Sequence, residues 1–174
     1  MAEFSWPSES ILHFSRSAQV AEKAKLIMET ASPRVHQIVS SMKAAGHRVT
    51  PQRLAILRQL ADSRSHPSAE KVYAAVKPDF PTTSLATVYK TIGMLKGLGE
   101  ALEIGFGDDC NRYDVRSPEP HPHLVCLKCR CIIDADLESF GHLTESLSKS
   151  TGFQIVSHRV DFYGTCPDCR KKRA

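Results

Sequence analysis

Four of the six cysteines in this 174-residue chain form two CxxC pairs. The first pair is Cys126 and Cys129, and the second is Cys166 and Cys169. Two intervening residues let both thiolates of a pair bind one ion from a tight turn, and two such turns complete a tetrahedral zinc site. Four thiolates leave no open coordination position, so we expect a structural zinc. A thioredoxin-like redox pair and a rubredoxin-like iron are the alternatives, and Cys110 and Cys131 have no assigned role.

A second group of residues has the chemistry of a different metal site. His121 and His123 lie two residues apart, so on an extended segment their side chains point the same way. Asp134 interrupts an apolar segment, where a lone charge is costly to bury unless it is paired or coordinated. With Asp114 upstream, the set offers two imidazoles and two carboxylates, which suit Fe(II), Mn(II) or Zn(II). The sequence therefore predicts a second metal site.

The expected redox compartment decides between metal binding and disulfides. Six cysteines could form three disulfides in an oxidising compartment. Residues 1–33 lack the basic start and apolar stretch of a secretory signal. No apolar run approaches the roughly 20 residues that span a bilayer. We therefore expect a cytoplasmic protein with no membrane partner and with reduced thiols.

Positive charge is concentrated in one part of the chain. Residues 33–97 hold ten Lys and Arg against three Asp and Glu, whereas the other segments hold 13 against 16. A basic segment joined to a mildly acidic remainder favours a polyanion partner for one half only. A basic surface that serves solubility is the alternative.

The basic segment has the pattern of a DNA-binding fold. Apolar spacing and capping residues predict helices that begin near Val35, at Thr50-Pro51, at His66-Pro67-Ser68 and at Thr82-Thr83-Ser84. Two strands, 100–104 and 111–115, follow with a turn at 105–109. This order is typical of a winged helix-turn-helix, whose fourth helix enters the major groove. The candidate DNA contacts, each of which could instead be a solvated surface residue, are Arg48, Gln52, Arg53, Ser84, Thr87, Tyr89 and Lys90.

The remainder of the chain is expected to form a small α/β unit. Apolar runs predict strands at 123–126, 131–135 and 152–163, and a helix at 136–150 with Phe140, Leu143 and Leu147 facing inward. A small sheet with one helix leaves apolar surface that a second copy of the chain would cover.

The whole chain is therefore expected to be α+β, with three parts. Residues 1–32 form an N-terminal extension, in which apolar spacing favours a helix. Residues 33–107 form a winged-helix domain that binds double-stranded DNA. Residues 108–174 form a metal-binding dimerisation domain.

Several motifs together resemble the ferric uptake regulator family of bacterial metal-dependent repressors. They are Thr50-Pro51-Gln52-Arg53, the segments 66–73 and 84–89, Arg112-Tyr113-Asp114, the run from His121 to Cys129, and the closing segment 163–169. The resemblance implies a homodimer and a structural zinc at Cys126, Cys129, Cys166 and Cys169. It also implies a regulatory metal bound by His66, Asp114, His121, His123 and Asp134. Bound metal would hold two winged helices at the spacing of one palindromic operator.

Two aspartates make the chain most similar to the peroxide-responsive branch of that family. The iron-uptake branch generally has Glu at the position of Asp134 and often at that of Asp114. In the peroxide-responsive branch, Fe(II) at the regulatory site reacts with hydrogen peroxide and oxidises a ligand histidine, here His66 or His121, which releases DNA. Mn(II) could occupy the same site. The alternative is an iron- or zinc-responsive repressor of the same fold that controls metal uptake.

Enzymatic functions fit the sequence less well. A metallohydrolase would need an open metal position and a base, but no Glu or His base lies beside the paired histidines. A catalytic cysteine at Cys110 or Cys131 has no matching His and Asn context. We therefore predict a regulator rather than an enzyme.

Overall fold

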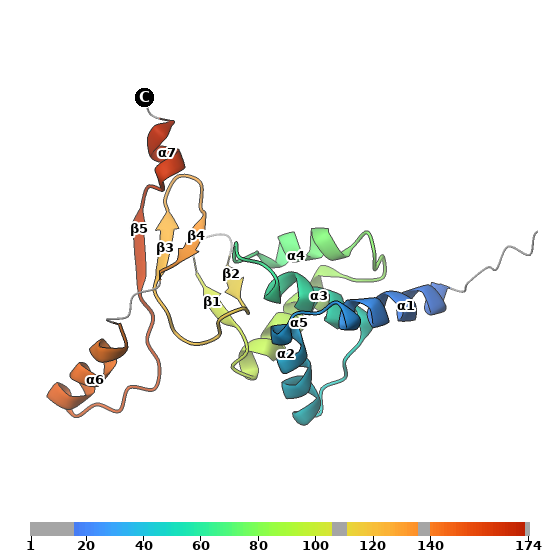
Figure 1. The fold of residues 1–174 in the computed structure, drawn as a ribbon, viewed down its shortest axis with the longest axis horizontal. Helices are drawn as coiled ribbons and strands as arrows, with labels where there is room; N and C mark the ends of the chain where they lie inside the picture. Colours follow the sequence, from blue (N-terminus) through green and yellow to red (C-terminus); the bar gives the residue numbers. More distant parts are fainter. Residues whose placement is uncertain (1–15, 106–110, 136–139, 173–174) are drawn as a thin grey trace, which may run out of the picture.

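The computed structural model describes residues 16–105, 111–135 and 140–172, and it separates a helical half from a sheet half (Figure 1). A short hairpin lies between the two halves. The helices and strands are α1 Arg16–Glu29, α2 Pro33–Ala44, α3 Pro51–Ala61, α4 Ala69–Val76, α5 Leu85–Gly97, β1 Leu102–Ile104, β2 Arg112–Asp114, β3 His123–Cys126, β4 Ile132–Asp134, α6 Phe140–Thr151, β5 Asp161–Gly164 and α7 Pro167–Lys171.

Side-chain caps fix where three of the helices begin. Thr50 accepts a hydrogen bond from the Arg53 backbone N–H at the start of α3. Ser68 and Ser84 do the same for α4 and α5. Each such cap stabilises a helix by about 1 kcal/mol. The predicted helix starts are confirmed, and His66 lies just before α4, outside the helix.

One apolar core holds the helical half and the hairpin together. Apolar side chains of α2, α3, α4 and α5 are buried in it. Tyr113 and Val115 belong to the same core, so β2 rests on the helices. Helix α1 packs Val20, Ala24 and Ile27 against this core. The part of the N-terminal extension that the structure describes is therefore attached to the helical half, whereas residues 1–15 lie outside the described chain.

The two sheets are short. Strands β1 and β2 pair antiparallel, with Leu102 opposite Asp114, as the sequence predicted. Most of the predicted turn at 105–109 lies outside the described residues. The second sheet has the order β4-β3-β5, in which β3 pairs antiparallel with β4 and parallel with β5. The central strand β3 is therefore the element that both outer strands share.

Two predictions for the C-terminal half are wrong. The strand expected at 152–163 is limited to β5, Asp161–Gly164, because its partner β3 offers only four residues and Pro122 before it has no N–H to continue the ladder. Leu143 and Leu147, expected to face inward, are each 46 % exposed. Helix α6 stands apart from the sheet, so the described residues leave these side chains about half uncovered (Figure 1). The side chain of Phe140 is outside the described residues.

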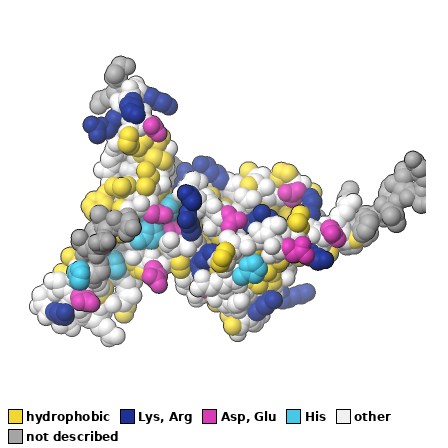
Figure 2. Space-filling model, viewed as in Figure 1, with side chains coloured by type: hydrophobic (Ala, Val, Ile, Leu, Met, Phe, Trp, Pro, Cys, Tyr) yellow, Lys and Arg dark blue, Asp and Glu magenta, His cyan; other side chains and the backbone are white. Residues whose placement is uncertain are grey.

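Apolar side chains are also exposed on the sheet. Figure 2 shows hydrophobic side chains gathered over the C-terminal half. Leu124, Ile133, Phe162 and Tyr163, from all three strands, are each between 43 % and 54 % exposed. Exposed apolar patches of this kind commonly mark interaction surfaces.

Candidate metal centres

Five predicted ligands from both halves of the chain meet at one point. His66 comes from the loop between α3 and α4, and Asp114 ends β2. His121 precedes β3, His123 begins it, and Asp134 ends β4. One ligand atom from each residue lies within 4.8 Å of all the others. The structure therefore brings together the whole set, including His66, which residue spacing alone did not predict.

Backbone contacts place His66 beside the hairpin. The carbonyl of Pro67 accepts a hydrogen bond from Tyr113 N–H at 3.2 Å, and Ser68 forms a bridge with Arg112. His66 itself has a φ of 47°, in the left-handed region. The residue before proline normally favours extended backbone, so this conformation is strained. Such strain persists where the surroundings enforce it, and it clusters at functional sites.

The three histidines direct the same ring nitrogen into the site. His66 Nε2 lies 2.8 Å from Asp134 Oδ1, and His121 Nε2 lies 3.2 Å from Asp114 Oδ2. His123 Nε2 lies 4.0 Å from Asp134 Oδ1. His121 Nε2, His123 Nε2 and Asp114 Oδ2 are buried without an aligned hydrogen bond. Because buried polar atoms are normally paired, these nitrogen and oxygen donors fit a divalent cation.

Asp114 and His121 stabilise each other's charged form. Burial would raise the pKa of Asp114, but the close contacts with His121 and His66 and the backbone hydrogen bond from Ser117 outweigh it and hold that pKa well below its usual range. The same contact with Asp114 raises the pKa of His121 to about 9, against the opposing effect of burial. Burial lowers the pKa of His123, and the neighbouring His121 and His66 lower it further. Asp114 is therefore a carboxylate, and His121 carries the proton that a metal ion must displace.

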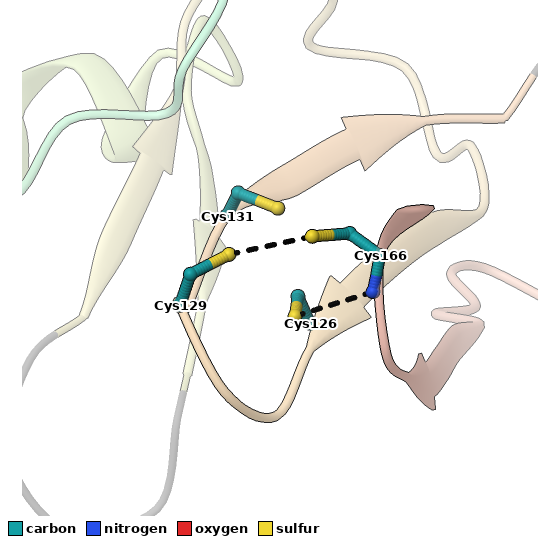
Figure 3. Close-up of side chains that lie close together, drawn as sticks. All are labelled: Cys126, Cys129, Cys131 and Cys166. Carbon is teal, nitrogen blue, oxygen red and sulfur yellow. Dashed lines mark hydrogen bonds between the residues drawn. The ribbon is translucent and has the colours of Figure 1, made fainter. Parts of the chain in front are cut away.

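A second cluster consists of thiols at the other end of β3 (Figure 3). The sulfurs of Cys126, Cys129, Cys131 and Cys166 lie within 4.8 Å of one another. Cys129 Sγ and Cys166 Sγ are 3.7 Å apart, and the Cys166 N–H donates to Cys126 Sγ at 3.3 Å. The turn between β3 and β4 thus meets the start of α7, as a metal shared by two CxxC pairs requires.

Backbone N–H groups prepare the first CxxC turn for metal binding. Donation from Cys129, Cys166 and Lys128 lowers the pKa of Cys126 to about 5. Donation from the Cys131 backbone lowers the pKa of Cys129. Arg130 adopts a φ of 59° to close this turn. The thiolate is the form of cysteine that binds metal, so the turn favours the ligand form of both residues.

The fourth thiolate has two candidates. Cys169, which the sequence predicted, lies outside the tightest group, whereas Cys131 lies inside it. Cys169 contacts Cys166 and Cys129, and these contacts raise its pKa to about 12. Contact with Cys129 raises the pKa of Cys131 to about 12 as well. Sequence reasoning gave Cys131 no role, although its position two residues after Cys129 could have suggested one. Cys110 is outside the described residues.

Comparison with known proteins identifies the fold and its general role. Residues 44–163 match the sequence profile of the ferric uptake regulator family. The chain belongs to this family. It is 34 % identical over 145 residues to the peroxide-responsive repressor PerR of Staphylococcus aureus, which covers 83 % of this chain and 97 % of that relative.

Solved structures support the same conclusion. The Campylobacter jejuni peroxide stress regulator is 31 % identical with a TM-score of 0.61, and the match covers 77 % of this chain and 97 % of that one. The ferric uptake regulator Fur of Helicobacter pylori has a TM-score of 0.66 at 22 % identity, over 84 % of this chain and 93 % of that one, which supports the fold alone.

Family membership confirms the predicted class of function. Proteins of the ferric uptake regulator family are metal-dependent transcriptional repressors that bind DNA as dimers, so this chain is a regulator and not an enzyme. Within the described residues, no helix combines the length and apolar character needed to cross a membrane.

The candidate DNA contacts of this Fur-family chain lie at the starts of α3 and α5. Gln52 donates to Thr82 at 3.3 Å, which brings the two helix starts together. Tyr89 and Lys90 are exposed on α5. Several candidates already have partners within the chain: Arg53 donates to the Arg48 carbonyl, Ser84 and Thr87 share a hydrogen bond, and Tyr89 donates to Glu70. Lys90 is consequently the simplest residue with which to test DNA binding.

We expect the purified chain to retain about one zinc ion, because a site of four thiolates contributes directly to folding. Cys126→Ser should lose this zinc under either assignment. Cys169→Ser should also lose it, because a second CxxC turn needs both thiolates, whereas Cys131→Ser should keep it. Metal analysis and light scattering measure zinc content and oligomeric state. Zinc retained by Cys169→Ser and lost by Cys131→Ser would make Cys131 the fourth ligand.

Metal binding at the His and Asp site should depend on pH. Because the pKa of His121 is raised to about 9, metal binding near neutral pH must displace its proton. The apparent affinity for Mn(II) should therefore rise about tenfold per pH unit up to that pKa and then level off. Calorimetry in two buffers of different ionisation enthalpy measures both the affinity and the proton release. An affinity that stays constant from about pH 7 to 8.5 would contradict this assignment.

Proposed function

We propose that the chain is a peroxide-sensing, metal-dependent repressor that uses Fe(II) at His66, Asp114, His121, His123 and Asp134. The observation that carries this proposal is the meeting of these five ligand atoms within 4.8 Å. The two aspartates and the similarity to peroxide-responsive relatives support the sensing role. Zinc bound by the thiol cluster would have a structural role.

The arrangement of the ligands explains how metal binding would control DNA binding. His66 belongs to the helical half, whereas His121, His123 and Asp134 belong to the sheet half. One ion bound by all of them fixes the orientation of the two halves. By thermodynamic linkage, DNA that favours this orientation tightens metal binding by the same factor.

Peroxide sensing would act on the histidines that hold the two halves together. Bound Fe(II) would supply the chemistry by which hydrogen peroxide transfers one oxygen atom to an imidazole carbon and leaves as water. His121 is 18 % exposed, so peroxide can reach it from solvent, and His66 lies directly beside it across Asp134. An oxidised imidazole is a poorer ligand, so His66 would separate from the sheet half and DNA would be released.

Dimerisation through the C-terminal half would complete the repressor. The exposed residues Leu124, Ile133 and Phe162 lie opposite one another on the three strands and form an apolar surface on one face of the sheet. Leu143 and Leu147 add an exposed apolar surface on α6. A second copy would cover these surfaces and present two α5 helices to a palindromic operator.

Exposure to peroxide tests this function directly. The Fe(II)-loaded chain should gain one oxygen atom on His66 or His121 and leave its operator, whereas the Mn(II)-loaded chain should do neither. Peptide mass spectrometry and DNA-binding assays measure the two effects. His142, exposed on α6, is an internal control that should stay unmodified. DNA binding that depends on Fe(II), without any histidine oxidation, would instead indicate an iron-responsive repressor, and a preference for Zn(II) would indicate a zinc-responsive one.

Lys90 should contact a DNA phosphate from α5. Lys90→Ala should weaken operator binding and reduce the slope of log affinity against log salt by about 0.9, the value for one released counterion. Lys149→Ala, which removes an exposed lysine from α6, is the matched control and should bind as the unaltered chain does. A salt slope for Lys90→Ala equal to that of the control would remove Lys90 from the DNA interface.

A further inference from the structure

Two of the three site histidines have an oxygen partner on the ring nitrogen that faces away from the site. His121 Nδ1 lies 2.8 Å from the carbonyl oxygen of Glu119. His123 Nδ1 lies 3.4 Å from a carboxylate oxygen, Oδ1 of Asp161. His123 therefore stands out, because its outer partner is a side-chain carboxylate and not a backbone carbonyl.

Strand pairing places Asp161 beside His123. His123 is directly opposite Asp134 on β4 and directly opposite Asp161 on β5. Residues opposite one another on neighbouring strands share one face of a sheet. The three side chains thus form a row across the sheet, with a candidate ligand carboxylate on one side of the imidazole and Asp161 on the other.

Among the residues that the structure describes, the two facing atoms of this pair have no other partner. Asp161 Oδ2 is held by Arg159 Nη2 at 2.5 Å and by the Tyr163 hydroxyl at 3.5 Å. Asp161 Oδ1 and His123 Nδ1 are both buried without an aligned hydrogen bond. A proton on Nδ1 would satisfy both atoms after a modest reorientation of the two side chains, which lie 3.4 Å apart. It would leave the lone pair on Nε2, the nitrogen that faces the metal site.

Arg159 extends this row to the winged-helix hairpin. Its guanidinium donates to the carbonyl oxygens of Glu103 at 3.4 Å and of Gly105 at 3.3 Å. Glu103 lies in β1, and Gly105 follows that strand directly. A continuous set of contacts therefore runs from His123 through Asp161 and Arg159 to the hairpin, and it does not pass through His66.

We propose that Asp161 is a positioning residue that holds His123 as an Nε2 ligand, and that Arg159 connects this residue to the hairpin of the DNA-binding half. Partners outside the ligand set commonly orient metal-binding histidines and tune their affinity. The inference rests on the proposed metal-dependent function. It adds a second connection between the regulatory site and DNA binding.

The tautomer of His123 tests the first part without metal at that site. We expect His123 to be protonated on Nδ1 in the zinc-containing chain without regulatory metal. NMR spectra that record two-bond ¹H–¹⁵N couplings of the imidazole rings measure this tautomer. Asp161→Asn should shift His123 toward the Nε2-protonated tautomer, and Asp161→Glu should restore the original signal. A predominantly Nε2-protonated His123 in the unaltered chain would overturn the proposal. This measurement uses the unaltered chain, so it does not depend on whether a variant folds.

Metal affinity gives a second measurement. Asp161→Asn should weaken Mn(II) binding by about 10- to 100-fold, the usual effect of losing such a partner. Zinc content and the dimer should be unchanged, and Asp161→Glu should recover most of the affinity. Glu145→Gln removes an exposed carboxylate of α6 and is the control. If Asp161→Asn bound Mn(II) as tightly as the control does, the proposal would be overturned. If the unaltered chain bound neither Mn(II) nor Fe(II), that result would count against the proposed function itself.

The connection through Arg159 predicts a separate effect on coupling. Arg159→Gln should reduce the factor by which Mn(II) tightens operator binding, at Mn(II) concentrations that saturate the site. Arg170→Gln removes an exposed arginine of α7 as the control, and its coupling factor should be unchanged. A coupling factor for Arg159→Gln equal to that of the control would show that the hairpin is not connected through Arg159.

Discussion

The contact of His66 with Asp134 of the sheet half and Asp114 of the hairpin is the interaction on which the candidate regulatory site depends. Asp114 is well suited to this role, because its two carboxylate oxygens have separate tasks. Oδ1 accepts hydrogen bonds from the backbone of Arg116 and Ser117 at 2.8 and 3.1 Å, which fixes the carboxylate in place. Oδ2 is left to face His66 and His121 at 3.5 and 3.2 Å. The end of β2 thereby contributes a fixed carboxylate oxygen to one side of the site.

A proton and a metal ion compete for the same ligand atoms in this site. Buried carboxylates are costly unless a positive charge is near, and in the metal-free chain protonated His121 supplies that charge to Asp114. The ligands therefore lie together before metal binds, and the proton on His121 must be released when the metal binds. Under the proposed function, a divalent ion would replace that proton with a larger charge and would bond all five residues at once. Metal binding would in this way strengthen an arrangement that the side chains already favour.

Local signals in the sequence predicted most of the fold, and the errors lie where a partner segment decides the structure. Thr50, Ser68 and Ser84 predicted helix starts because a cap acts within one turn. The predicted length of β5 was wrong because the alternation of apolar and polar residues indicates a strand but not how far the neighbouring strand extends. The inward face assigned to Leu143 and Leu147 was wrong because helical spacing shows which residues share a face but not what covers it.

The same distinction applies to the metal centres. His121, His123 and Asp134 could be predicted from spacing, because all three lie in or beside one antiparallel pair of strands. His66 lies far away in sequence, and only the family resemblance supplied it. The sequence did not indicate the contacts of Asp161 and Arg159 with the site, because β5 pairs with β3 in parallel after a long connection, and no short-range pattern reports such a pairing. The proximity of Cys131 to the other thiols was not predicted, because two complete CxxC pairs already accounted for four ligands.

Strand β3 explains why a chain that senses through one metal would need another. His123 begins this strand and Cys126 ends it, so the two candidate metal centres lie at opposite ends of four residues (Figure 1). A shift of one residue in strand pairing would turn His123 to the other face and move Asp134 and Asp161 out of line with it. Such short strands hold their register weakly by themselves. A metal bound by the thiol cluster would join the turn after β3 to the segment after β5 and fix the ends of both strands. The alignment of the proposed regulatory ligands would then follow from that constraint.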